Sequence, residues 1–183
     1  CIRFEIEIHG LNPEMSAEEF KEISNAFNGR ENGYLNNGLE NRDNYYMKRV
    51  YLGCVRSIDL LTSLPEWDGK NVIVQGGSQG GALALITTGL DSRVTACVAN
   101  HPALSDMAGY KAGRAGGYPH FFRVEGMDTP DKLKTMAYYD VVNFARMIKV
   151  PTYITWGYND DTCPPTTSYA VYNVLDCPKE ALI

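Results

Sequence analysis

After the apolar run Val72-Ile73-Val74 comes the pentapeptide Gly76-Gly77-Ser78-Gln79-Gly80, and the helix-forming sequence Ala82-Leu83-Ala84-Leu85-Ile86 follows it. This is a G-x-S-x-G motif at a place where a buried strand is expected to turn into a helix. In such a nucleophile elbow, a sharp backbone turn exposes the serine hydroxyl at the top of a parallel sheet. Glycines are needed because the turn is strained and the helix packs close to the strand. The motif predicts that Ser78 is a nucleophile.

The same glycines allow two other interpretations. One is an ordinary glycine-rich turn without chemistry, which the sequence leaves open. The other is a phosphate-binding loop. The sequence argues against that loop because no Gly-Lys-Ser/Thr follows the glycines and the G-x-G-x-x-G spacing is absent.

Strand and helix patterns alternate on both sides of the motif. The sequence predicts strands at residues 2–8, 72–75, 94–99 and 151–156, helices at 45–64, 79–88, 130–144 and 166–175, and a long surface loop at 25–44. Such alternation is typical of a parallel sheet with right-handed crossovers. We therefore expect one α/β domain over residues 1–183.

Charge and composition argue against several classes of partner. The 183 residues carry a formal net charge of −5, and the basic residues are scattered. We therefore expect neither nucleic acid nor a membrane as a partner, and the longest apolar runs are far too short to span a bilayer. No signal peptide is recognisable. The composition leaves the compartment open between the cytoplasm and a periplasmic or secreted location.

The cysteines indicate free thiols rather than a disulfide framework or a metal site. Their count is odd, their spacing is wide, and no C-x-x-C pair or zinc-type spacing occurs. We expect Cys54 and Cys97 to be buried core residues because they lie in apolar stretches. We expect no metal and no cofactor. The five residues are Cys1, Cys54, Cys97, Cys163 and Cys177.

A nucleophilic serine needs a base and an orienting carboxylate, which in elbow-type hydrolases follow in the order serine, acid, histidine. Asp160 and Asp161 come just after the predicted strand 151–156. Active sites in open α/β sheets lie beyond the carboxyl ends of the strands, so both aspartates are candidates for the acid. The alternative is a solvated turn with two surface carboxylates. For the oxyanion, we expect the backbone N–H of Gln79 and a second N–H from an early loop.

The three histidines all precede Asp160. His101 follows the predicted strand 94–99, so we expect it near the top of the sheet, most simply as a loop residue lining the cleft. His9 ends the first predicted strand and is expected near the mouth of the site. His120 stands beside two phenylalanines and is expected to be a packing or substrate-side residue. The base therefore either comes out of order or lies outside this sequence.

Three stretches of the chain resemble the acetyl xylan esterase and cephalosporin C deacetylase family, carbohydrate esterase family seven. The resemblance runs from about residue 42 to residue 173 and, more weakly, back to His9-Gly10-Leu11-Asn12, which departs from the family's Arg-Gly-Gln-Gly. It rests on the elbow preceded by Tyr45-Tyr46…Arg49…Tyr51, on Tyr139-Asp140-Val141-Val142-Asn143-Phe144-Ala145…Ile148-Lys149-Val150-Pro151, and on Gly157-Tyr158-Asn159-Asp160…Cys163-Pro164-Pro165-Thr166-Thr167.

The resemblance implies an α/β-hydrolase truncated at both ends. By it, Ser78 is the nucleophile, Asp160 the triad acid and Gln79 an oxyanion donor. The family's histidine, in a Gly-His-Glu context, would lie beyond Ile183, and the second oxyanion donor before Cys1. This chain would then have weak or no activity by itself.

The resemblance also implies a substrate and an assembly. The substrates would be O-acetyl groups on xylan oligosaccharides or similar small acetylated carbohydrates, and members of the family often form hexamers. Two alternatives remain open: a peptidase or dienelactone-type hydrolase on the same fold, and a catalytically degenerate domain used for binding.

Overall fold

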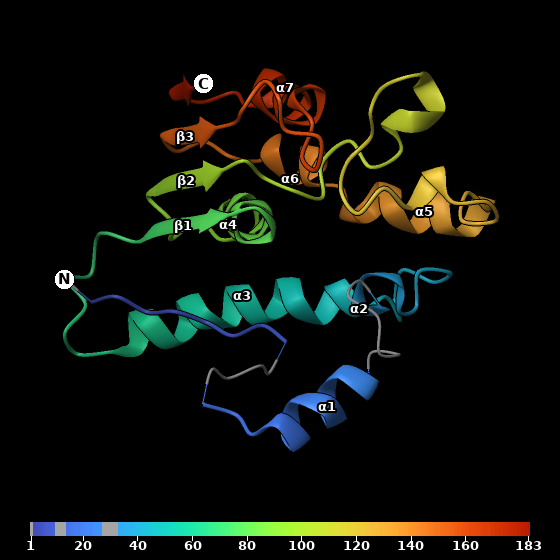
Figure 1. The fold of residues 1–183 in the computed structure, drawn as a ribbon. Coiled ribbons are helices and arrows are strands. Elements are labelled where there is room, and N and C mark those ends of the chain that lie inside the picture. Colours follow the sequence, from blue (N-terminus) through green and yellow to red (C-terminus); the bar gives the residue numbers. More distant parts are fainter. Residues whose placement is uncertain (1, 10–13, 27–32) are drawn as a thin grey trace.

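The computed structural model describes residues 2–9, 14–26 and 33–183. At its centre is a four-stranded, parallel sheet in the order β1 (Ile73–Gly77), β2 (Ala96–Asn100), β3 (Thr152–Thr155) and β4 (Lys179–Leu182) (Figure 1). The first three are apolar segments that the sequence predicts. β4 is not among the predicted strands, because an edge strand that is half exposed to solvent has no apolar run in its sequence. The predicted α/β architecture is confirmed.

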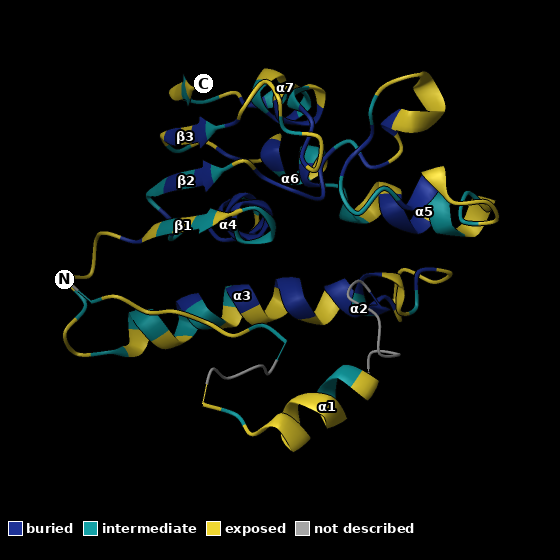
Figure 2. Ribbon diagram, in the orientation of Figure 1, coloured by how far each residue is buried: buried dark blue, intermediate teal, exposed yellow. Residues whose placement is uncertain are grey.

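Helices cover one face of the sheet. α4 (Gln79–Leu90) packs on β1 and β2, α6 (Val141–Ala145) lies beside α4, and α7 (Pro165–Val174) lies beside α6 (Figure 1). The long helix α3 (Tyr46–Ser63) packs on α4 as well. Figure 2 shows α4 as mostly buried, with every residue from position 81 to 88 inside the core. A helix that is apolar all round has to be buried, as its sequence indicates.

The opposite face of the sheet is open among the described residues. Ile73, Tyr153 and Leu182 project on that face and are 66%, 45% and 65% exposed. Sheets of this class usually carry helices on both faces. Among the described residues, helices therefore cover only one face of this sheet.

The first predicted strand, residues 2–8, is wrong. This segment forms no strand, and Phe4 and Ile6 are 44% and 38% exposed. Alternation with a period of two shows only that a segment can form a strand, and here no neighbouring strand pairs with it among the described residues. The segment is held at its end instead, where His9 hydrogen-bonds to Tyr46 in α3.

The predicted surface loop at 25–44 is partly wrong. A short helix, α2 (Gly33–Asn36), lies within it, and Leu35 and Leu39 are fully buried in the main core. These two leucines fix the segment against the domain, while residues 27–32 lie outside the described residues. Before it, α1 (Ala17–Ala26) begins with a capping box, in which Ser16 and Glu19 bond each other's backbone N–H groups.

The single helical region predicted at 130–144 is two helices, α5 (Pro130–Tyr139) and α6. Asp140 separates them because its backbone is extended (φ −66°, ψ 128°) and its carboxylate accepts the N–H of Val142 as the N-cap of α6. The same carboxylate accepts the N–H groups of Asp106 and Met107. Asp140 therefore fixes the loop after β2, which continues into two 3₁₀ turns, η1 (Gly109–Ala112) and η2 (Phe121–Arg123).

Candidate active site

Ser78 stands in the tight turn between β1 and α4. Its backbone has φ 51° and ψ −116°, a conformation that a residue with a side chain adopts only under strain. The end of β2 holds it there: the Ser78 N–H donates to the Asn100 carbonyl at 2.9 Å, and the Ala103 N–H donates to the Ser78 carbonyl at 3.0 Å. The structure thus places the half-buried Ser78 at the carboxyl edge of the sheet.

Two close backbone contacts explain the glycines of the turn. A Cβ on Gly76 would lie 2.2 Å from the Gly80 carbonyl oxygen, and a Cβ on Gly81 would lie 2.8 Å from that of Asn100. Real Cβ atoms do not approach backbone oxygens so closely, so α4 packs against the sheet only with glycine at these positions. Gly80 itself has open space where its Cβ would be.

Asp160 lies in the loop after β3, and its carboxylate is held by backbone donors. One oxygen, Oδ1, accepts the N–H groups of Thr162 at 2.9 Å and Cys163 at 2.8 Å. Asp160 is half-buried. Asp161 is exposed, and its carboxylate accepts only a long hydrogen bond from the Thr162 hydroxyl at 3.5 Å among the described contacts. Of the two predicted aspartates, Asp160 is therefore the one whose carboxylate is oriented by the fold.

Cys163 closely follows Asp160 in the same loop. Its thiol is buried near the Ser78 side chain, and its backbone N–H donates to Asp160 Oδ1. Burial, with the nearby charge of Asp160, raises the pKa of this thiol to about 11. Cys163 therefore stays neutral near pH 7. Sequence reasoning did not include it among the site residues, although its place three residues after Asp160 is a local signal.

His101 lies beside the elbow. A Cβ on Gly77 would lie 3.6 Å from His101 Nε2, so the imidazole ring stands over the second residue of the motif. The His101 N–H donates to the Thr155 carbonyl at 2.7 Å, which places the residue above the carboxyl ends of β2 and β3. The side chain is exposed. Among the described residues, no hydrogen bond joins its ring to Ser78 or Asp160.

His120 and His9 contact other parts of the site. His120 Nε2 lies 3.1 Å from the Thr162 carbonyl, so this ring steadies the loop of Asp160. Burial, with the charge of Arg123, lowers the pKa of His120. His9 Nε2 lies 3.3 Å from the side-chain nitrogen of Gln79, the residue after the nucleophile.

The side chain of Gln79 is held from two sides. Its oxygen accepts from the Tyr34 hydroxyl at 2.9 Å, while its nitrogen faces His9. His9 Nδ1 in turn lies 3.1 Å from the Tyr46 hydroxyl, and its ring packs 4.1 Å from that of Tyr34. These four residues come from the N-terminal segment, α2, α3 and α4. Sequence reasoning assigned no role to Tyr34.

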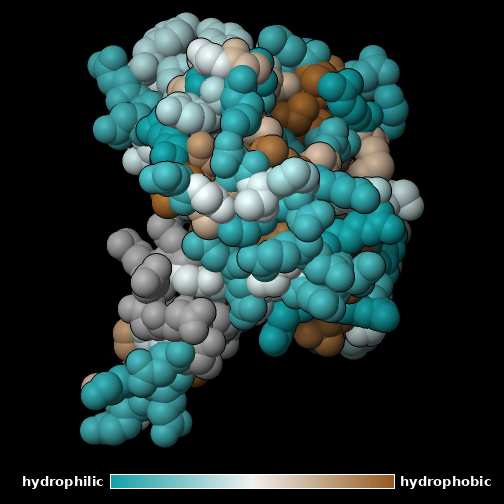
Figure 3. Space-filling model, turned by 90° about the vertical axis from the view of Figure 1, so that its right-hand side faces the viewer, coloured by the Kyte–Doolittle hydropathy of each residue, from teal (hydrophilic) through white to brown (hydrophobic). Residues whose placement is uncertain are grey.

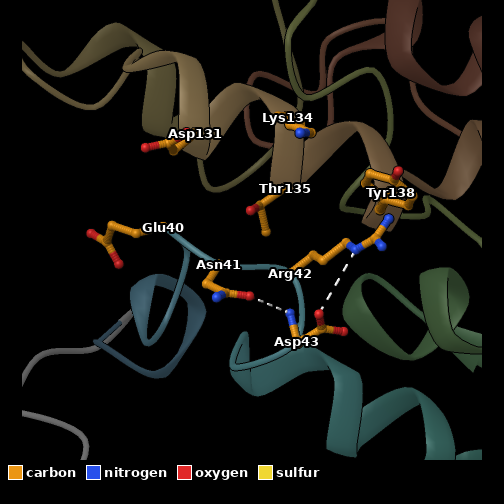
Figure 4. A pocket seen from close by; sticks show the side chains of 8 residues that line it. All are labelled: Glu40, Asn41, Arg42, Asp43, Asp131, Lys134, Thr135 and Tyr138. Atoms are coloured by element: carbon orange, nitrogen blue, oxygen red, sulfur yellow. Dashed lines mark hydrogen bonds and ion pairs between the residues drawn. The ribbon is translucent and has the colours of Figure 1, made fainter.

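A separate polar hollow of about 310 Å³ lies between residues 40–43 and α5 (Figure 4). The Arg42 guanidinium stacks on the Tyr138 ring at 4.4 Å, and Arg42 also pairs with Asp43. No predicted site residue lines it. Figure 3, turned to show the side toward which the strands point, is mainly hydrophilic with scattered hydrophobic side chains.

The described residues show neither a metal site nor a membrane-spanning helix. They contain no cluster of three or more His, Cys, Asp or Glu side chains suited to a metal ion. No helix among them is long and apolar enough to cross a membrane. Cys54, Cys97, Cys163 and Cys177 are free thiols, and Cys54 and Cys97 are buried as predicted. Cys1 lies outside the described residues.

Comparison with known proteins agrees with this geometry. A family model described as acetyl xylan esterase matches residues 3–183. The chain belongs to the acetyl xylan esterase family. Acetyl esterase Axe7A from Xylanibacter ruminicola is 74% identical over 182 residues, which cover 100% of this chain and 41% of that protein. The chain thus spans less than half of this relative's length.

Solved structures of the acetyl xylan esterase family also resemble this chain. An acetyl xylan esterase from Paenibacillus sp. R4 has a TM-score of 0.74 and 36% identity, with 82% of this chain and 50% of that one covered. Acetyl xylan esterase 1 from Thermoanaerobacterium sp. JW/SL YS485 has a TM-score of 0.73 and 28% identity, with 83% and 51% covered. Hydrolases and peptidases at 21% identity or less share the α/β-hydrolase fold alone.

Proposed function

We propose that this chain carries the nucleophile and the acid of a serine carboxylic-ester hydrolase that removes O-acetyl groups from xylan oligosaccharides or similar small acetylated carbohydrates. The observation that carries the proposal is the strained Ser78 at the end of β1, at the same carboxyl edge of the sheet as Asp160, whose carboxylate is oriented by the backbone N–H groups of Thr162 and Cys163. Membership of the acetyl xylan esterase family supports the choice of acetyl esters.

In the proposed reaction, the Ser78 oxygen attacks the acetyl carbonyl carbon while a histidine takes its proton. Asp160 orients that histidine and stabilises its charged form. The backbone N–H of Gln79 donates to the oxyanion, since this N–H belongs to the residue after the nucleophile at the start of α4. The sugar hydroxyl leaves with the proton from the histidine. Water then attacks the acetyl-serine, and acetate is released.

We propose that the histidine base lies outside residues 1–183. The described contacts support this because His9 and His120 bind Gln79 and the Thr162 carbonyl, and His101 stands over Gly77. Without its base a triad enzyme keeps only residual catalysis. Residues 1–183 alone are therefore expected to hydrolyse acetyl esters weakly or not at all. Assembly into hexamers belongs to the same proposal, and sedimentation of the natural protein tests it.

A fluorophosphonate probe tests the nucleophile in the natural protein that contains this chain. We expect the label on the peptide with Ser78 and its loss in Ser78→Ala, while Ser105→Ala, at a buried serine bonded to the Ala103 carbonyl, keeps it. Labelling that is unchanged in Ser78→Ala would refute the proposal.

The substrate class is tested with the same natural protein on three kinds of compound. Acetyl esters should be hydrolysed faster than longer acyl esters, and peptide amides hardly at all. Faster cleavage of the amides would indicate a peptidase. Absence of turnover on every ester would indicate a degenerate domain.

A further inference from the structure

One face of α5 forms a wall of the polar hollow, opposite the segment of residues 40–43 (Figure 4). The residues of this wall recur three or four positions apart, so their side chains lie next to one another along the helix. The segment 40–43 forms the other wall, just before α3. Only the folded chain brings these two walls together. The residues on the α5 side are Asp131, Lys134, Thr135 and Tyr138.

Thr135 is the residue that points to a ligand. It is only 3% exposed, and its side chain projects from α5 towards residues 40–43 (Figure 4). Its hydroxyl has no hydrogen-bond partner among the described residues. Thr88 of α4 is also buried, but its hydroxyl donates to the Ala84 carbonyl at 2.7 Å. Because buried polar groups are nearly always bonded to protein or water, the Thr135 hydroxyl is available to a molecule in the hollow.

The charges around the hollow balance one another. Glu40 pairs with Lys132 at 3.8 Å, and Asp43 pairs with Lys48 at 3.3 Å. The two charged residues of the α5 wall are exposed and opposite in sign. Exposed charges are screened by water and salt, so these two favour neither an anion nor a cation. The described residues also contain no cluster suited to a metal ion. The hollow therefore suits a polar ligand without net charge.

A sugar residue has the groups that match this lining. Each sugar hydroxyl both donates and accepts, so one can bind Thr135 while others accept from Lys134 and donate to Asp131. The Tyr138 ring is 49% exposed and offers an apolar surface for the C–H groups of a sugar ring. The volume of about 310 Å³ lies at the lower end of the range for small-molecule sites.

The wall of residues 40–43 is held in place by the rest of the domain. The Tyr139 hydroxyl, at the end of α5, donates to the Arg42 carbonyl at 2.6 Å. Within the segment, Asn41 Oδ1 accepts the N–H of Asp43 at 2.8 Å. Figure 1 shows α5 on the side towards which the strands point, which is also the side of Ser78. A chain-like ligand on that side can therefore reach both the hollow and the catalytic edge.

From these contacts we propose that the hollow binds a neutral sugar residue of a xylan chain, away from the acetyl group that reacts at Ser78. The choice of xylan rests on the proposed function, whereas the preference for an uncharged sugar rests on the lining itself. The Thr135 hydroxyl makes the central hydrogen bond. Such a site adds affinity for longer oligosaccharides and leaves the chemical step unchanged, because the contact is the same before and during the reaction.

Hydrogen–deuterium exchange of the natural protein with xylohexaose tests the site without any turnover. We expect slower exchange in the peptides that contain residues 40–43 and 131–138. In Thr135→Val this protection should need about two- to tenfold more xylohexaose, because a buried hydrogen bond is lost. Lys134→Ala, at an exposed position, should also weaken it. Thr88→Val is the matched control and should keep full protection, since that hydroxyl bonds within its own helix.

Three outcomes of this experiment would overturn the proposal. The first is exchange in residues 131–138 that xylohexaose does not change. The second is equal xylohexaose affinity in Thr135→Val and Thr88→Val. The third is stronger protection by a hexamer of galacturonic acid, which has the same length but carries negative charge and would indicate an anion site.

The consequence for turnover is measured in the natural protein with two substrates. On acetylated xylohexaose, Thr135→Val should raise KM about two- to tenfold with kcat unchanged, since it removes uniform binding. On 4-nitrophenyl acetate, which is too small to reach the hollow as well, both constants should stay the same. An equal loss on both substrates, or no loss on either, would overturn the site. No turnover by the unaltered protein would instead refute the esterase function, while the exchange experiment still decides the site.

Discussion

Replacing Gly76 by alanine is the sharpest test of how the elbow is built. Its Cβ would lie 2.2 Å from the Gly80 carbonyl oxygen and 2.3 Å from the Gly80 carbonyl carbon. Both atoms belong to the backbone of the first turn of α4, so no side-chain rotation relieves the clash. Either β1 or the start of α4 has to move, and with it the turn that holds Ser78.

The size of the effect follows from this geometry. Extra volume in a packed interior usually costs about 1–3 kcal/mol, and we expect about 3 kcal/mol because the obstructing atoms are backbone. For a domain of this size, that lowers Tm by roughly 6–12 °C. Gly80→Ala is the matched control in the same turn, because its Cβ meets nothing within 4 Å. Alanine is also favoured over glycine in a helix by about 1 kcal/mol.

Urea unfolding of the two variants, followed by circular dichroism, measures the difference. We expect Gly76→Ala to lose about 3 kcal/mol and Gly80→Ala to stay within about 1 kcal/mol of the unaltered chain. Equal stabilities of Gly76→Ala and Gly80→Ala would refute the close packing of β1 on α4.

Four further predictions concern the site and its supports. Ser78→Gly should raise Tm by roughly 2–4 °C, because relief of about 1–3 kcal/mol of backbone strain exceeds the entropy cost of glycine, whereas Ser78→Ala keeps its Cβ and should not; calorimetry showing the same Tm for both would contradict this. Asp140→Ala should lower the free energy of unfolding by about 3 kcal/mol or more, because three backbone donors lose their acceptor, and Asp140→Asn should lose less; equal losses in urea titrations would argue against these bonds. Burial raises the pKa of the Asp140 carboxyl in the folded chain above its value in the unfolded chain. The folded chain therefore binds the Asp140 proton more tightly, and the stability that this group contributes should fall as pH rises from below the unfolded pKa through the folded pKa. Cys163 should react slowly with iodoacetamide at pH 8 in the folded chain, because burial raises its pKa to about 11, and quickly in urea; mass spectrometry showing rapid native labelling would contradict its burial.

The elbow could be predicted from the sequence because its signals are local. A buried strand, a serine between glycines and an apolar helix follow one another within residues 72–88, and each element forms where predicted. The sequence did not show which glycines matter. Gly76 and Gly81 are needed because the chain passes close to their Cα atoms, whereas Gly80 has open space.

The candidate acids were predicted from topology rather than from local sequence. Residues after parallel strands meet at one edge of the sheet, and Asp160 and His101 both lie at that edge. The family resemblance favoured Asp160 over Asp161, and the structure adds the physical reason. The backbone N–H groups of Thr162 and Cys163 hold the carboxylate of Asp160.

The surroundings of Gln79 were beyond sequence reasoning. His9 is 70 residues from Gln79 in the chain and Tyr34 is 45 residues away, so only the folded chain brings them together. The period-two pattern of residues 2–8 also misled, since a strand needs a partner that local sequence does not supply. Similarly, the Asn and Gly residues at 25–44 indicated a surface loop, although Leu35 and Leu39 within it are buried.

The most direct test of the account is to trap the covalent intermediate in the natural protein that contains this chain. The protein is mixed with acetylated xylo-oligosaccharides, quenched in acid during turnover, digested and analysed by mass spectrometry. The account predicts an acetyl group on the peptide with Ser78, together with acetate release that Ser78→Ala abolishes. Acetate release that continues in Ser78→Ala, or an acetyl group on another residue, would contradict it.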